Sequence, residues 1–269
     1  MKRMLATFRE AMARRGLTLH PSKCKVQTNS KNPYTYGQMQ IQEDFSVEVL
    51  PPGANLVVLG TVLNLEDVTE KEITNRIASA WRLFWSMKPI LLNRRVSVKR
   101  RLRLFDATVS SCVTWCCESW APIKEELQRL EVARRSMLRK IVCTGRGPAE
   151  EWISWIRRAT HKALDLASQT GVRKWTTFHG SKKWRWAGHV ARRGVDTWLY
   201  KVTTWRDSTW QKHAMDMGGA RELRPAGRPS TRWEDPVRTY CARHDLQNWT
   251  DLAANREQWE AHAESFADF

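Results

Sequence analysis

The hydrophobic period of this 269-residue chain changes near Thr69, and this change constrains the fold more than any other feature. Before it, β-like runs at 24–28, 34–41, 45–50 and 56–63 are separated by turn sequences such as Asn-Pro and Pro-Pro-Gly. After it, apolar residues recur every three or four positions, which is the helical period. The pattern predicts an α+β, mostly α fold, in which a small antiparallel β meander follows an N-terminal helix over 2–15.

The helical part divides once more, at the Gly-Arg-Gly-Pro turn of residues 145–148. Apolar stripes predict a helix from 69, a second over about 96–116 and a third over 125–142. A further helix over 150–169, a helix start at Thr231 and a last helix over 251–263 follow the turn. We therefore expect three regions, at 1–68, 69–146 and 147–269.

Positive charge indicates the kind of partner. Lys and Arg outnumber Asp and Glu by 45 to 28, a net charge of +17, of which +12 lies in residues 1–146. Such a field attracts polyanions, meaning RNA, DNA or an anionic membrane surface. No run approaches the ~20 apolar residues that span a bilayer, and the start of the chain lacks the apolar region of a secretory signal. We expect RNA and DNA as partners, no membrane, and an intracellular location in a nuclear or cytoplasmic ribonucleoprotein.

Two segments carry the candidate nucleic-acid contacts. The first places six cations on the start of a predicted helix, with no acid before Asp106. The second, 171–193, interleaves seven cations with three tryptophans and contains no acid. Cations suit phosphates, and aromatic faces suit unpaired bases. The alternative is that Trp184 and Trp186 anchor a core while the cations only solvate its outside. The candidates are Arg94, Arg95, Lys99, Arg100, Arg101 and Arg103, then Arg173, Lys174, Trp175, Lys182, Lys183, Trp184, Arg185 and Trp186.

The six cysteines form no Cys-x2-Cys pair and have no histidines at zinc-finger spacing. Cys112 and Cys116 lie one turn apart on an apolar helix, where buried free thiols are the default. We expect a reduced protein without a metal site.

Seven segments, in this order, resemble the downstream part of a non-LTR (LINE-type) retrotransposon reverse transcriptase. GLTLHPSKCKV (16–26) resembles the segment that closes the polymerase palm, and LVVLGTVLN (56–64) the Leu-Gly hairpin that follows it. Residues 72–91, 96–120 and 127–142 resemble the thumb helices, and WRWAGHVAR (184–192) and GRPSTRWEDPVRTY (227–240) resemble two tail segments. The three regions would then be the end of the palm, a thumb-like helical bundle and a basic, Trp-rich tail.

The resemblance implies roles for three further residues. Lys23 falls at the Lys position of the palm-closing segment, near the incoming nucleotide, although a solvated lysine is an equal alternative. Leu59 and Gly60 fall at the turn that grips the primer end in the family. A plain hairpin turn, in which Gly60 supplies a positive φ, explains these two residues equally well.

The chain also departs from the family. Polymerase chemistry needs carboxylates that hold two metal ions, and two of them come from an Ala-Asp-Asp turn in the family, whereas this chain contains no Asp-Asp pair. We therefore expect a nucleic-acid-binding fragment of an RNA-directed DNA polymerase, inactive alone, without its N-terminal polymerase segment. It would have no catalytic residue, metal or cofactor, since Mg²⁺ is expected only for a complete polymerase.

Two other functions remain open at this point. The chain could be a host-coopted binding or scaffold protein that is built on the same helices. It could also be an independent enzyme, such as a nuclease, with Glu150, Glu151, His161 and Asp165 in a cleft.

Overall fold

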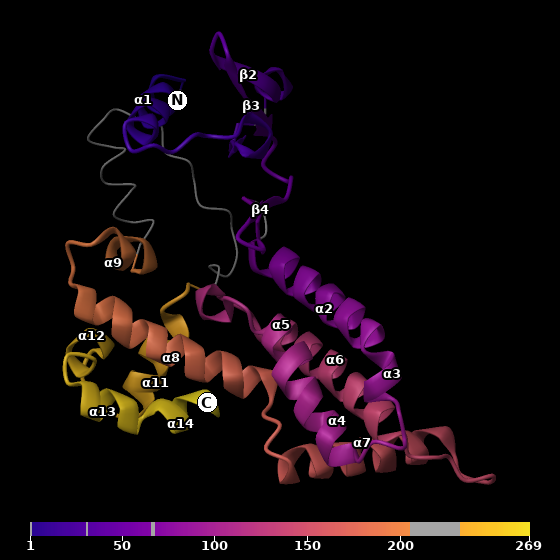
Figure 1. Cartoon of the computed structure of the whole chain (residues 1–269). Coiled ribbons are helices and arrows are strands. Elements are labelled where there is room, and N and C mark those ends of the chain that lie inside the picture. Colours follow the sequence, from indigo (N-terminus) through magenta and orange to yellow (C-terminus); the bar gives the residue numbers. More distant parts are fainter. Residues whose placement is uncertain (1, 31, 66–67, 205–231) are drawn as a thin grey trace. The chain divides into compact units, whose positions relative to one another are not determined.

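The computed structural model describes residues 2–30, 32–65, 68–204 and 232–269 and divides into two compact units, Met1–Asn75 and Arg76–Phe269 (Figure 1). Among the described residues, strands occur only before residue 64, and helices dominate the rest. This confirms the predicted α+β, mostly α fold. The expected helix start at Thr231 lies outside the described residues.

The first unit contains helix α1, Lys2–Ala13, and a three-stranded sheet of β1, Lys25–Gln27, β2, Gly37–Gln42, and β3, Phe45–Leu50. The chain leaves α1 through Gly16, whose φ of 73° suits a helix C-terminus. Strand β3 lies between the other two, antiparallel to β2 but parallel to β1. The predicted antiparallel meander is therefore wrong for β1. Single-strand patterns show which residues alternate but not the direction of their neighbours.

Strands β4, Leu56–Val58, and β5, Thr61–Leu63, form a separate antiparallel hairpin. Both residues of its two-residue turn have positive φ, 50° at Leu59 and 81° at Gly60. Such turns match the right-handed twist of the strands. The Val62 N–H, 2.7 Å from the Glu72 carboxylate, donates a hydrogen bond to it. The Leu-Gly sequence therefore forms the tight hairpin that was predicted.

Helix α2, Val68–Ser86, crosses the boundary between the units, and α3, Lys88–Leu91, follows it. The helix predicted over 96–116 consists of α4, Val98–Phe105, a π-helical turn, Asp106–Ser110, and α5, Ser111–Val113. Helices α6, Lys124–Val142, and α7, Trp152–Gln169, then pack on each other. The predicted apolar stripes of α2, α4 and α6 are buried. They include Phe84, Leu102, Phe105, Leu130, Met137 and Ile141.

Helix α8, Trp175–Arg193, is the long helix of the remaining part, and Figure 1 shows short helices along it. The expected last helix over 251–263 is broken into several pieces. The short helices are α9, Trp198–Thr203, α11, Asp235–Arg243, α12, Trp249–Leu252, α13, Arg256–Ala261, and α14, Ala263–Ala267. Their apolar side chains surround Trp184 in an aromatic core.

No helix in the described ranges has the length and apolar character needed to cross a membrane.

Candidate nucleic-acid interface

The cations around the start of α4 are mostly exposed. Arg94 and Arg95 lie in the turn before the helix, where the Asn93 side chain accepts a hydrogen bond from the Arg95 N–H. Lys99, Arg100 and Arg103 are exposed on α4 itself. Arg103 lies three residues after Arg100 and four after Lys99, spacings that make it a neighbour of both on the helix surface. Within the described ranges, none of these five cations forms an ion pair.

Arg101 is the exception in this segment, because only 6% of it is exposed. Its guanidinium donates to the carbonyls of Val96, at 3.0 Å, and Leu91, at 3.2 Å, and also to that of Ile141. Burial lowers the pKa of this guanidinium. Arg101 therefore joins the backbones around α3, α4 and the end of α6, and its predicted phosphate contact is incompatible with this position.

Two of the three tryptophans predicted to stack on bases in α8 are buried. Trp184 is fully buried, and its ring lies parallel to that of Trp259, with centroids 3.7 Å apart. Each indole N–H donates to the backbone carbonyl of the other residue, at 2.8 and 3.1 Å. Trp175 is 1% exposed and donates to the Ser110 hydroxyl in the π-helical turn. Neither ring offers a face to a base, which supports the alternative reading of the patch as a core anchor.

The remaining residues of the 171–193 patch divide between surface and interior. Lys183 is 1% exposed, whereas Trp186 and Lys182 are half-buried. The Lys182 ammonium donates to the Thr114 carbonyl at 3.2 Å. Three of the predicted cations, Arg173, Lys174 and Arg185, are exposed.

An exposed aromatic surface lies instead on α2, where the sequence reasoning did not place one. Trp85 is 46% exposed and stacks on Trp81, with ring centroids 6.0 Å apart. The Lys140 ammonium of α6 lies 5.4 Å from the Trp85 ring centroid. The available signal was that Trp85 follows Phe84 directly and so falls off the apolar stripe of its helix.

This tryptophan surface is connected to the arginine turn before α4. Lys140 contacts Trp85, and Cys143, three residues further along, accepts a hydrogen bond from Arg94 at 2.9 Å. Residues three apart on a helix are neighbours, and Cys143 directly follows the last residue of α6. The end of α6 therefore connects the exposed indole with the arginine turn. We call Trp85, Lys140, Arg94, Arg95, Lys99, Arg100 and Arg103 the basic surface.

A shallow groove of about 620 Å³ lies between α2 and α6. Ile77 and Trp81 line one side of it, and Arg129, Val132 and Ser136 lie among the residues of the other. The groove thus combines apolar and polar side chains next to the Trp81–Trp85 stack.

The residues that the resemblance singled out in the first unit lie at its surface. Lys23 is exposed at the end of a short 3₁₀ turn, Pro21–Lys23. Leu59 is 87% exposed at the tip of the hairpin, beside Gly60. A large apolar side chain at positive φ is uncommon, so this turn carries a local strain that the hairpin itself explains.

The residues of the enzyme alternative do not converge on one another. Glu150 pairs with Arg158, Glu151 accepts a hydrogen bond from Ser154, and Asp165 pairs with His161. Arg158 holds the Glu150 carboxylate at 2.6 Å, and this interaction lowers the pKa of Glu150 to about 2. His161 and Asp165 pair at 2.9 Å on the exposed side of α7. Over the part of the chain that the structure describes, no three His, Cys, Asp or Glu side chains are grouped to hold a metal ion.

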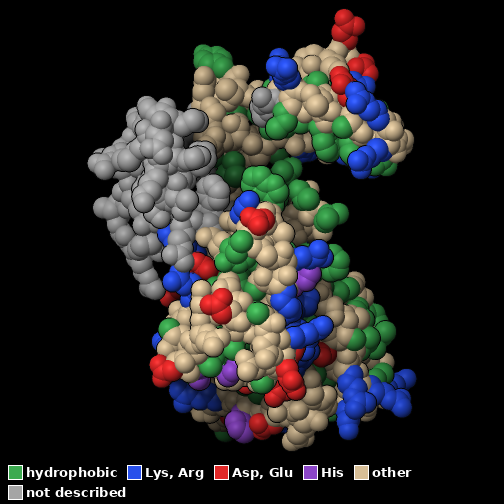
Figure 2. Space-filling view, turned by 90° about the vertical axis from the view of Figure 1, so that its left-hand side faces the viewer, with side chains coloured by type: hydrophobic (Ala, Val, Ile, Leu, Met, Phe, Trp, Pro, Cys, Tyr) green, Lys and Arg blue, Asp and Glu red, His purple; other side chains and the backbone are tan. Residues whose placement is uncertain are grey.

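On the face that Figure 2 shows, Lys and Arg side chains form several patches on the described surface, with acidic side chains scattered between them. The fold and this surface define a mostly helical α+β protein with exposed basic patches. No family model matches the chain, and no solved structure gives a significant match. The chain is 26% identical over 268 residues to an uncharacterized transposon-derived protein of Caenorhabditis elegans, covering 96% of this chain and 87% of that protein. It is thus a distant homologue of a transposon-derived protein.

Proposed function

We propose that this chain binds RNA and single-stranded DNA through the basic surface, as the downstream part of a LINE-type reverse transcriptase. The observation that carries the proposal is the group of five exposed cations around the start of α4, unpaired with acids in the described ranges and connected to Trp85 through the end of α6. Phosphates would pair with the cations, and one or two bases would stack on the indole.

The polymerase resemblance and the transposon-derived relative support this proposal from independent directions. The hairpin at 56–63 and the helices over 68–142 have the element types that the resemblance implies for the palm hairpin and the thumb. Because the sequence contains no Asp-Asp pair, we expect no Mg²⁺- or Mn²⁺-dependent primer extension by this chain alone. Incorporation of nucleotides above a mock preparation would contradict that expectation.

The experiment that tests binding is a salt titration of affinity. The variant Arg95→Ala/Lys99→Ala/Arg100→Ala/Arg103→Ala removes four exposed cations, and labelled single strands and duplex are titrated at several salt concentrations. On single strands, log K falls with log salt with a slope of roughly −0.7 for each phosphate contact. The quadruple variant should therefore flatten the slope by up to about 3.

The matched control removes the same charge elsewhere, as Lys2→Ala/Arg3→Ala/Arg14→Ala/Arg15→Ala, since these four residues are also exposed. It should leave most of the slope in place. Equal loss in both variants would mean that net charge, and not the basic surface, drives binding. A host-coopted scaffold role would be favoured if the wild-type chain binds no nucleic acid at moderate salt.

A further inference from the structure

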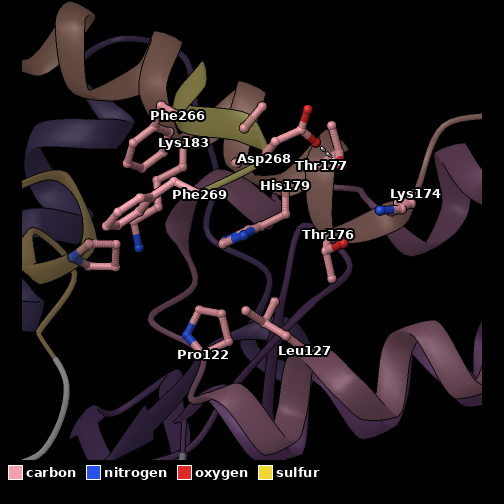
Figure 3. Close-up of a pocket in the computed structure, with 13 residues that line it drawn as sticks. Pro122, Leu127, Lys174, Thr176, Thr177, His179, Lys183, Phe266, Asp268 and Phe269 are labelled. Atoms are coloured by element: carbon pink, nitrogen blue, oxygen red, sulfur yellow. Dashed lines mark hydrogen bonds between the residues drawn. The ribbon is translucent and has the colours of Figure 1, made fainter. Parts of the chain in front are cut away.

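The second unit contains a pocket that the proposed function does not use. It has a volume of about 270 Å³ and lies between α8, the start of α6 and the residues around α14 (Figure 3). Phe266 and Phe269 line one part, and Pro122 and Leu127 face His179 from the other side. The walls are thus mainly apolar and aromatic, as in sites that hold a small planar ligand.

His179 presents an uncharged ring to this pocket. It is 7% exposed and stacks on Trp120, with ring centroids 6.0 Å apart. Burial, and secondarily the nearby Lys183, lower its pKa to about 3, so the ring is neutral near pH 7. Its Nε2 atom has no hydrogen-bond partner among the described residues. The ring therefore forms an aromatic wall of the pocket, and its Nε2 atom is available for a hydrogen bond with a ligand.

The pocket has a lysine at each of two ends, the buried Lys183 and the exposed Lys174. Lys183 is 1% exposed, and its Nζ donates to the Trp120 carbonyl at 2.8 Å while lying 5.1 Å from the Trp233 ring centroid. An ammonium has three N–H donors and a neutral amine has two, so a donor remains in either state. Lys174 is exposed, and Figure 3 shows it on the opposite side of His179 from Lys183.

Lys174 and the Thr176 hydroxyl of the lining can donate to an anion, whereas the Asp268 carboxylate is the lining group that opposes one. Thr176 is half-buried in the lining, and Thr177 donates its hydroxyl proton to the Asp268 carboxylate at 3.0 Å. That hydrogen bond occupies one oxygen of the acid. Arg173 is exposed next to Lys174, with its guanidinium 4.7 Å from the Phe178 ring centroid. Arg173 is not among the residues that line the pocket, so Lys174 is the exposed cation of the lining that suits a phosphate.

We propose that this pocket holds one unstacked nucleobase of a single strand, with a base carbonyl oxygen accepting from Lys183 and a neighbouring phosphate on Lys174. The proposal rests on the proposed function, because it needs a single strand on this chain. Keto bases such as uracil have a carbonyl oxygen, whereas adenine offers only ring nitrogens as acceptors. The pocket would therefore add a base preference to binding that is otherwise insensitive to sequence.

The test compares three labelled 12-nucleotide strands of equal charge on the full chain: oligo-U, oligo-A and an abasic strand. The wild-type chain should bind oligo-U about tenfold more tightly than the abasic strand and several-fold more tightly than oligo-A. Lys183→Met should remove the preference for U over A. Leu127→Trp, which fills the pocket from a half-buried position, should bring oligo-U close to the abasic strand.

Thermal unfolding of both variants provides the control for folding, and Leu127→Trp tests the pocket independently if Lys183→Met is unstable. Equal binding of all three strands by the wild type would overturn the pocket proposal and leave the proposed function standing. If no strand binds, the proposed function fails, and uridine 5′-monophosphate decides the pocket separately. Its binding, lost in Leu127→Trp, would support the pocket, and its failure to bind at millimolar concentration would overturn it.

Discussion

Helices α4 and α8 both combine cations with apolar residues, but they differ in how many of these side chains are buried. Helix α4 buries one side, and most of its cations stay in water. Helix α8 is contacted by α6, α9, α12, α13 and α14, so that Trp184 and Lys183 are enclosed. The comparison teaches that the number of neighbours around a helix, and not its charge, decides whether its cations and aromatics are exposed to solvent.

The largest expected effect separates the buried indoles of α8 from the exposed one of α2. Trp184→Ala should lower the free energy of unfolding by about 3–5 kcal/mol, as is typical when a buried aromatic side chain is truncated. Trp85→Ala should change it by less than about 1 kcal/mol, since this ring is half exposed. Chemical denaturation of each variant, with helix content as the signal, measures both values. Similar losses for the two variants would contradict the distinction between core and surface.

A smaller effect is expected within the α4 segment itself. Arg101→Met removes donors from several buried carbonyls and should lower stability by about 1–3 kcal/mol. Arg100→Met, the control next to it in the sequence, should stay within about 0.5 kcal/mol. Conversely, only the Arg100 change should weaken the binding of single strands per folded molecule. Both quantities come from denaturation curves and a binding titration, and an unaffected stability of the Arg101 variant would show that its carbonyl contacts are dispensable.

The smallest effect concerns the titration of His179 in α8. Its folded pKa, about 3, lies below the unfolded value of 6.5. The unfolded state therefore binds more protons between these values, and stability is complete above pH 6.5 and decreases as the pH falls toward 3. Between pH 6.5 and 5.5 this group should account for about 1 kcal/mol. His179→Phe keeps an aromatic ring beside Trp120, and its pH profile should be flatter by that amount; parallel profiles would contradict the assignment.

Local signals predicted much of the fold because they depend on neighbours in the sequence. The apolar stripes through Phe84 in α2 and through Leu102 and Phe105 in α4 were visible from residue type and spacing alone, and the Leu59–Gly60 turn came from the resemblance. The parallel pairing of β1 was not, since the direction of a partner strand leaves no mark within three residues. The break in the last predicted helix also depends on residues distant in the sequence. Short helices, and not one long helix, pack Trp259 and Phe266 against α8.

For the candidate site, the sequence by itself determined which residues could contact a polyanion, through an excess of cations on helical periods. It also determined that the chain contains no Asp-Asp pair. Only the tertiary structure decided which of these candidates face water. It buried Arg101, Trp175, Trp184 and Lys183, and it exposed Trp85 beside Lys140. The physical reason is that charge and aromaticity belong to single residues, whereas burial depends on distant segments such as α6 and α14 that pack against them.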